Sequence, residues 1–84
     1  MKYYIVTWLE ESRDYPPNCI VCGVAKSLEN AKKILQEELS ANEKWLKEND
    51  KEYEVNKAEK QVFINDIDGD FCYTIEIQEC EGEV

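Results

Sequence analysis

The sequence predicts an α+β protein in which a four-stranded, mostly antiparallel sheet carries one long helix on one face, in the order ββαββ. Three patterns lead to this fold class. Apolar side chains recur at helical spacing over residues 28–49, period-two alternation precedes and follows that stretch, and Asp68-Gly69 is typical of a tight hairpin turn. A length of 84 residues favours a single domain covering residues 1–84.

Residues 2–9 and 19–25 are the first two predicted strands, and together they are expected to form a hairpin. The segment that joins them, residues 10–18, is polar and contains Pro16-Pro17, which cannot donate to a strand ladder. The first strand is apolar on both sides, which favours a central position or a sheet with a second covered face. Its two sides carry Tyr3, Ile5, Thr7 and Leu9 on one face and Tyr4, Val6 and Trp8 on the other.

The long helix over residues 28–49 follows Ser27, which is a good N-cap residue, and Glu29 favours the positive end of the helix dipole. Asn49-Asp50 is the predicted stop. One narrow arc, at about 100° per residue, is apolar, while lysines and glutamates occupy the opposite side. The helix is therefore expected to bury one face, made by Leu28, Ala31, Leu35, Leu39 and Leu46.

Residues 50–60 allow two interpretations. Tyr53 and Val55 alternate with Glu52 and Glu54, as they would in a short edge strand, but the segment could equally be a mobile connection. The prediction of four strands counts it as a connection.

Residues 61–67 and 70–78 are predicted to form a second hairpin around Asp68-Gly69, because a type I′ turn needs positive φ at both central positions. That turn fixes a register, and the apolar alternation agrees with it. The order of the strands in the sheet does not follow from these patterns. The predicted pairs are Ile67 with Asp70, Asn65 with Cys72, Ile64 with Tyr73 and Val62 with Ile75, and the face toward the helix is Val62, Ile64, Phe71, Tyr73, Ile75 and Ile77.

Few residues suggest chemistry. Histidine is absent, so the usual general base and commonest metal ligand are missing. We see no glycine-rich phosphate loop and no nucleophile beside a base, and therefore expect no enzymatic activity and no cofactor. The cysteines leave three alternatives open: a zinc site, a redox or disulfide role, or ordinary small apolar side chains. They are Cys19, Cys22, Cys72 and Cys80.

The first residues show no signal-peptide pattern, and no apolar run approaches the ~20 residues of a membrane span. A cytoplasmic protein with reduced thiols is the simplest expectation.

Charge is the strongest functional clue. The net charge is −9, and residues 61–84 contribute −7 because they contain no lysine or arginine. A patch of one sign attracts a protein partner with a basic surface and repels nucleic acid and anionic membranes. The alternative is that acidic side chains serve only solubility. The predicted partner-binding acidic face consists of Asp66, Asp68, Asp70, Glu76, Glu79, Glu81 and Glu83.

Apolar residues give a second clue, because one helix can cover only one face of a sheet. We expect Tyr4, Trp8 and Phe63 to lie on the uncovered face, where they would bind a partner or a second subunit. If the helix covers that face instead, Tyr3, Ile5 and Leu9 become the exposed set.

In size, acidity and sheet-plus-helix build, the chain resembles small inhibitor proteins of phages and mobile elements, including anti-CRISPR proteins. The resemblance implies a phage-encoded inhibitor that presents carboxylates to the nucleic-acid-binding cleft of a host defence enzyme, and it assigns no individual residue. Two alternatives stay open: a structural or housekeeping homodimer, and a small zinc-binding module.

Overall fold

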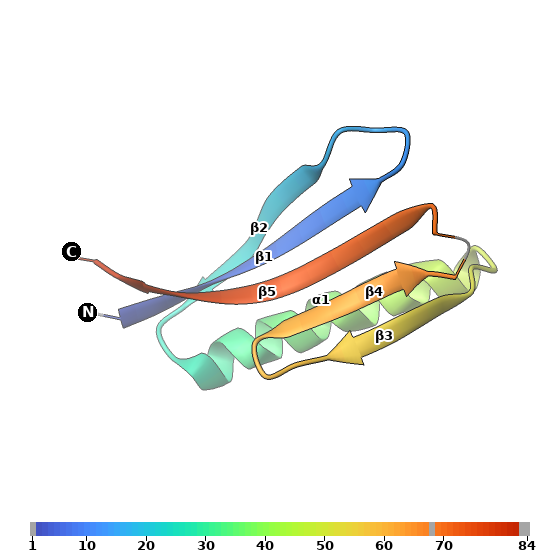
Figure 1. Cartoon of the computed structure of the whole chain (residues 1–84). Coiled ribbons are helices and arrows are strands. Elements are labelled where there is room, and N and C mark those ends of the chain that lie inside the picture. The colour runs from blue at the N-terminus through green and yellow to red at the C-terminus, as the bar shows by residue number, and fades with distance from the viewer. Residues whose placement is uncertain (1, 68, 83–84) are drawn as a thin grey trace.

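The structure, a computed structural model, describes residues 2–67 and 69–82. In these residues the chain forms one helix and five strands (Figure 1). The elements in chain order are β1 (Lys2–Ser12), β2 (Asn18–Ala25), α1 (Leu28–Glu48), β3 (Tyr53–Lys57), β4 (Gln61–Asp66) and β5 (Phe71–Glu81).

The sheet is antiparallel throughout, with the strand order β2-β1-β5-β4-β3. The α+β class is confirmed, but the prediction of four strands is wrong because Tyr53–Lys57 pairs with β4 as a fifth strand at the edge of the sheet. Val55 lies opposite Ile64 and packs against the buried core, so even this short segment contributes apolar surface. The edge-strand interpretation of residues 50–60 is therefore the one that holds.

The central strands β1 and β5 pair along their full length, from Lys2 opposite Glu81 to Ser12 opposite Phe71. β1 continues past its predicted end at Leu9, so that part of the expected polar connection is strand. The loop between β1 and β2 is correspondingly shorter, and Pro16-Pro17 lie within it.

Helix α1 begins and ends with side-chain caps. At its start, the Ser27 Oγ accepts a hydrogen bond from the Asn30 N–H at 3.2 Å, as expected of an N-cap. At its end, the Asn49 side-chain amide donates to the Trp45 carbonyl at 2.8 Å. The predicted apolar arc is largely confirmed: Ala31, Leu35, Leu39 and Leu46 are buried, and Leu28 packs against the core at partial burial.

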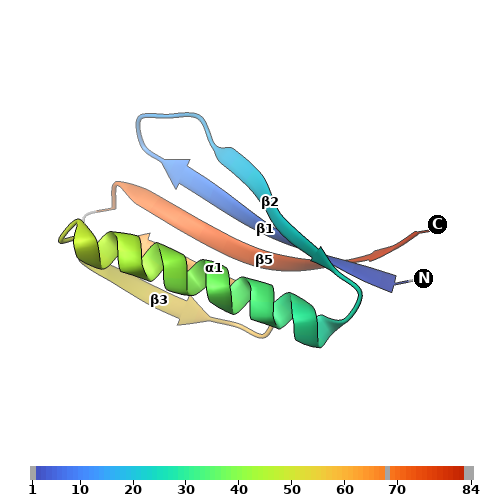
Figure 2. The ribbon, with the colours of Figure 1, turned by 180° about the vertical axis from the view of Figure 1, so that it is seen from behind.

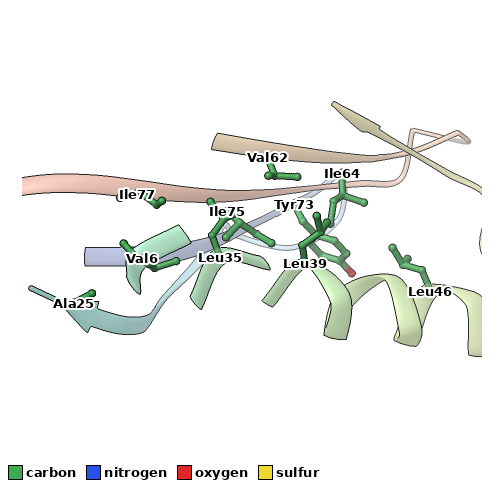
Figure 3. Packing of buried hydrophobic residues seen from close by; sticks show 11 residues of the cluster. Val6, Ala25, Leu35, Leu39, Leu46, Val62, Ile64, Tyr73, Ile75 and Ile77 are labelled. Carbon is green, nitrogen blue, oxygen red and sulfur yellow. The ribbon is translucent and has the colours of Figure 1, made fainter. Parts of the chain in front are cut away.

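Helix α1 packs on one face of the sheet only, as the two views in Figures 1 and 2 show. The predicted register of the second hairpin is confirmed at Val62–Ile75, Ile64–Tyr73 and Asn65–Cys72. The face predicted to meet the helix does so, because its members lie in the core under α1 (Figure 3). The sheet residues buried there are Val6, Ala25, Val62, Ile64, Tyr73, Ile75 and Ile77.

The connection between β4 and β5 differs from the predicted two-residue turn. The strands end before Ile67 and resume after Asp70, and the Gly69 N–H donates to the Asp66 carbonyl at 3.0 Å. Gly69 has the positive φ, +77°, that the turn prediction required of it. Asp68, the other predicted turn residue, lies outside the described residues.

Strand β2 contains an irregularity where α1 crosses it. The register with β1 shifts between Val6 and Thr7, so β2 has an extra residue at that point. Gly23 lies beside this shift, and a Cβ there would be 3.1 Å from the Ile34 Cδ1 of the helix. The absence of a side chain at Gly23 therefore lets α1 approach β2 closely.

Candidate partner-binding surfaces

The face of the sheet opposite α1 has no described element over it. On β1, Val6 is completely buried beneath the helix, and neighbouring strand residues point to opposite sides. Ile5, Thr7 and Leu9 therefore point away from the helix. We refer to this side as the helix-free face.

Apolar side chains from β2, β1 and β4 gather on the helix-free face. Val24 and Ile5 are directly opposite each other on β2 and β1. Val21 on β2 and Val24 are 61% and 60% exposed, which is high for valine in a strand. Leu9 and Phe63 flank Thr74 of β5 on either side. We define the helix-free patch as Ile5, Leu9, Val21, Val24 and Phe63.

The charges on the helix-free face have one sign. Glu76 of β5 lies between Thr7 on β1 and Gln61 on β4, beside the patch. Glu11 and Glu54 occupy strand positions on the same face, nearer the end of the sheet. In the described strands no lysine or arginine shares this face, because the strand lysines alternate to the helix side.

The predicted acidic face is not one surface. Asp66 is 8% exposed, and its Oδ2 accepts a hydrogen bond from the Asp70 N–H at 3.3 Å. Glu79 forms an ion pair with Lys2 at 3.1 Å, and this carboxylate raises the pKa of the Lys2 amine. Glu81 lies opposite Lys2 across the β1–β5 ladder. Two of the predicted acidic residues are thus engaged within the fold.

The remaining members of that acidic set are far apart. Asp70 lies just before β5, Glu81 ends it, and an extended strand of this length spans about 35 Å at roughly 3.3 Å per residue. Glu76 points to the helix-free face from the middle of β5. Asp68 and Glu83 lie outside the described residues. A partner that contacts Glu76 would therefore have to be wide to reach the other carboxylates.

The predicted apolar set is also divided between two faces. Tyr4 and Trp8 are on the helix side, where both pack against the core. The Trp8 Nε1 donates to the Asn42 Oδ1 of the helix at 3.1 Å, and the Trp8 ring lies 5.2 Å from that of Tyr73. Only Phe63 is on the helix-free face. The alternative set of Tyr3, Ile5 and Leu9 is the one that points away from the helix.

The four cysteines do not converge. None forms a disulfide. Cys72 and Cys80 are both on β5, about 26 Å apart at 3.3 Å per residue, while Cys19 lies on β2 at the far edge. Cys22 packs against the core instead, and burial together with the nearby Glu38 carboxylate raises the pKa of its thiol to about 11. Across residues 2–67 and 69–82, no group of three or more possible metal ligands is found.

A hollow of about 410 Å³ lies at the end of the sheet where β1 and β4 finish. It is lined by Arg13 as well as by Glu11, Asp66 and Asp70. The Ser12 Oγ beside it is buried without a hydrogen-bond partner among the described residues. Because its lining mixes both signs of charge, the hollow favours neither an anion nor a cation.

Comparison with models of protein families, with curated proteins and with solved structures gives no match for this chain. Among the described residues, no helix is both long enough and apolar enough to cross a membrane.

Proposed function

We propose that this chain is a protein-binding protein that docks through the helix-free patch, and that its partner places lysine or arginine side chains against Glu76. The proposal rests on one observation: the helix-free patch and the Glu76 carboxylate lie on the same face, and no lysine or arginine of the described strands lies on that face. Apolar surface gains roughly 25 cal/mol per Å² when it is removed from water. A protein partner would supply that burial.

The charge of the face defines the chemistry of the partner. Glu76, Glu11 and Glu54 give the helix-free face only negative charge in the described strands. A partner with lysine or arginine opposite Glu76 would pair that charge, whereas an acidic partner would be opposed by it. This keeps the sequence-based prediction of a basic partner and moves the contact from the C-terminal acidic residues to the helix-free face.

Proteins that bind nucleic acid carry basic surfaces of this kind. An inhibitor that occupies such a surface is the specific form of the proposal that we favour. A direct nucleic-acid ligand is disfavoured because the net charge of −9 opposes phosphate.

The test is a binding assay against a panel of purified nucleic-acid-binding enzymes, with a charge-reversal variant and a matched control. Glu76→Lys should weaken binding at least tenfold, because it opposes the cations of the partner at the centre of the contact. Glu37→Lys changes the net charge equally, but on the exposed side of α1, and should alter affinity less than about twofold.

Raising the salt concentration should weaken the wild-type complex, since part of the attraction is between charges. A partner that binds wild type and Glu76→Lys equally well, with no dependence on salt, would contradict the proposal.

A further inference from the structure

Strand β2 lies at one edge of the sheet, and it differs from β3, the strand at the other edge. It pairs with β1 on one side only, so its outer backbone groups have no partner strand in the described sheet. β3, at the opposite edge, has five residues and carries Glu54 and Lys57. Charged side chains and shortness are two ways in which proteins prevent edge strands from pairing with one another. β2 has eight residues and no charge.

The outer half of β2 is exposed on both of its sides. Asn18, Cys19, Ile20 and Val21 are all exposed, whereas the half beyond the register shift is partly covered by α1. Ile20 is 51% exposed although it lies on the helix side of the sheet. Figures 1 and 2 show the reason, because the hairpin of β1 and β2 extends away from α1 in both views.

We propose that the segment Cys19–Val21 of β2 pairs antiparallel with the same segment of a second copy of this chain, which joins two sheets edge to edge. Antiparallel pairing of identical strands about a two-fold axis is self-complementary. A register centred on Ile20 places Ile20 opposite its own copy on the helix side. It also places Cys19 opposite Val21 of the second copy on the helix-free side.

Two features limit the length of this pairing. Pro16-Pro17 precede β2, and proline cannot donate to a ladder. The extra residue in β2 interrupts the strand at its other end, next to Gly23. The interface is therefore short, below the roughly 1,200 Å² at which standard stable interfaces begin, and we expect a weak dimer that forms at roughly 10 µM to 1 mM.

The charge distribution favours a second copy as the occupant. Two chains of −9 repel each other over most of their surface. Residues 15–25 form an uncharged run, and residues 1–26 contain three acidic and three basic residues. Contact through β2 therefore brings together the neutral parts of the two molecules. A contact through the second hairpin would oppose one acidic segment to another.

The experiment is sedimentation equilibrium of the full chain with two lysine variants of β2. Ile20→Lys places a charge in the proposed pairing segment, outside the helix-free patch, and should leave a monomer over the whole concentration range. Val24→Lys adds the same charge to the same strand, beyond the register shift, at a similarly exposed site. It should dimerise within about twofold of wild type while losing partner binding.

Salt separates the two proposals, because screening should strengthen the dimer and weaken the complex with a basic partner. Hydrogen exchange gives a test without mutation: within Cys19–Val21, the backbone amides that point away from β1 should gain protection as concentration rises, and the amides of Tyr53–Lys57 should not. A wild-type chain that stays monomeric at about 1 mM in high salt overturns the inference. So does an Ile20→Lys variant that dimerises as wild type does.

Discussion

Trp8 makes two kinds of contact on the helix side of the sheet: a hydrogen bond to the helix and a ring contact with Tyr73. Its Nε1 donates to Asn42, and the Asn42 side-chain amide donates in turn to the Glu38 carbonyl at 2.7 Å. Its ring continues an aromatic cluster in which Phe71 stacks on Tyr73 at 4.8 Å. The sequence pattern predicted that Trp8 binds a partner. These contacts indicate instead that Trp8 stabilises the fold.

Trp8→Phe should therefore destabilise the fold and leave partner binding intact. The variant keeps the aromatic contact but removes the hydrogen-bond donor to Asn42, which contributes about 1 kcal/mol in comparable cases. Urea denaturation measures the loss in free energy of unfolding. The binding assay measures affinity for the partner, with Glu76→Lys as the variant that loses it. A variant with wild-type stability and weakened binding would instead place Trp8 in the interface.

Single residues also show where prediction from sequence is limited. Asp66 was predicted to be part of an acidic surface, yet strand alternation places it on the same side as Val62 and Ile64. That alternation was visible in the sequence, but a carboxylate next to a turn is usually solvated. In the connection to β5, the Asp66 Oδ2 accepts a hydrogen bond from the Asp70 N–H.

At the scale of elements, α1 and the hairpin of β4 and β5 were predictable because each carries several consistent signals. The 21-residue helix has an N-cap, an apolar arc and a stop signal. In the hairpin, the register that the turn predicts agrees with the alternation of apolar and polar side chains. β3 was left undecided because its five residues offer only two apolar side chains, Tyr53 and Val55. It pairs with β4 as a hairpin through the short turn at residues 58–60, where no Asn-Gly or Asp-Gly sequence marks the turn.

The packing of α1 on β2 can be tested at Gly23. Gly23→Val should lower the free energy of unfolding by about 1–3 kcal/mol, because the new side chain would collide with Ile34 and force the helix or strand to shift. Thermal or urea denaturation measures this change. Val24→Thr, at the exposed neighbouring position, is the control and should have little effect. Equal stability of the two variants would mean that α1 does not approach β2 as described.

At the scale of the whole molecule, the sheet has one buried face and one that is open. β1 is apolar on both sides, so its sequence could not show which side the helix covers, and the two possibilities had to stay open. The structure resolves this through Val6 and Ile75, which are completely buried under α1. The patch defined here exists only because the strand order brings β2, β1, β5 and β4 together, and that order was not predictable.

The two proposals are compatible in one assembly. Edge pairing through β2 about a two-fold axis perpendicular to the sheet keeps both helices on one side and both helix-free faces on the other. Such a dimer would present two patches on a continuous surface. A partner with a repeated binding surface would then bind both patches, and the second contact would become intramolecular.

Partner binding through the helix-free patch requires the helix-free face to be open in the free protein. The most direct measurement is paramagnetic broadening of methyl NMR signals by a soluble, uncharged nitroxide at low protein concentration. The methyl signals of Ile5, Leu9 and Val24 should broaden strongly, while those of Val6 and Ile75 should stay sharp. If the methyl groups of Ile5 and Leu9 were as protected as those of Val6, that face would be covered and partner binding through the helix-free patch would be contradicted.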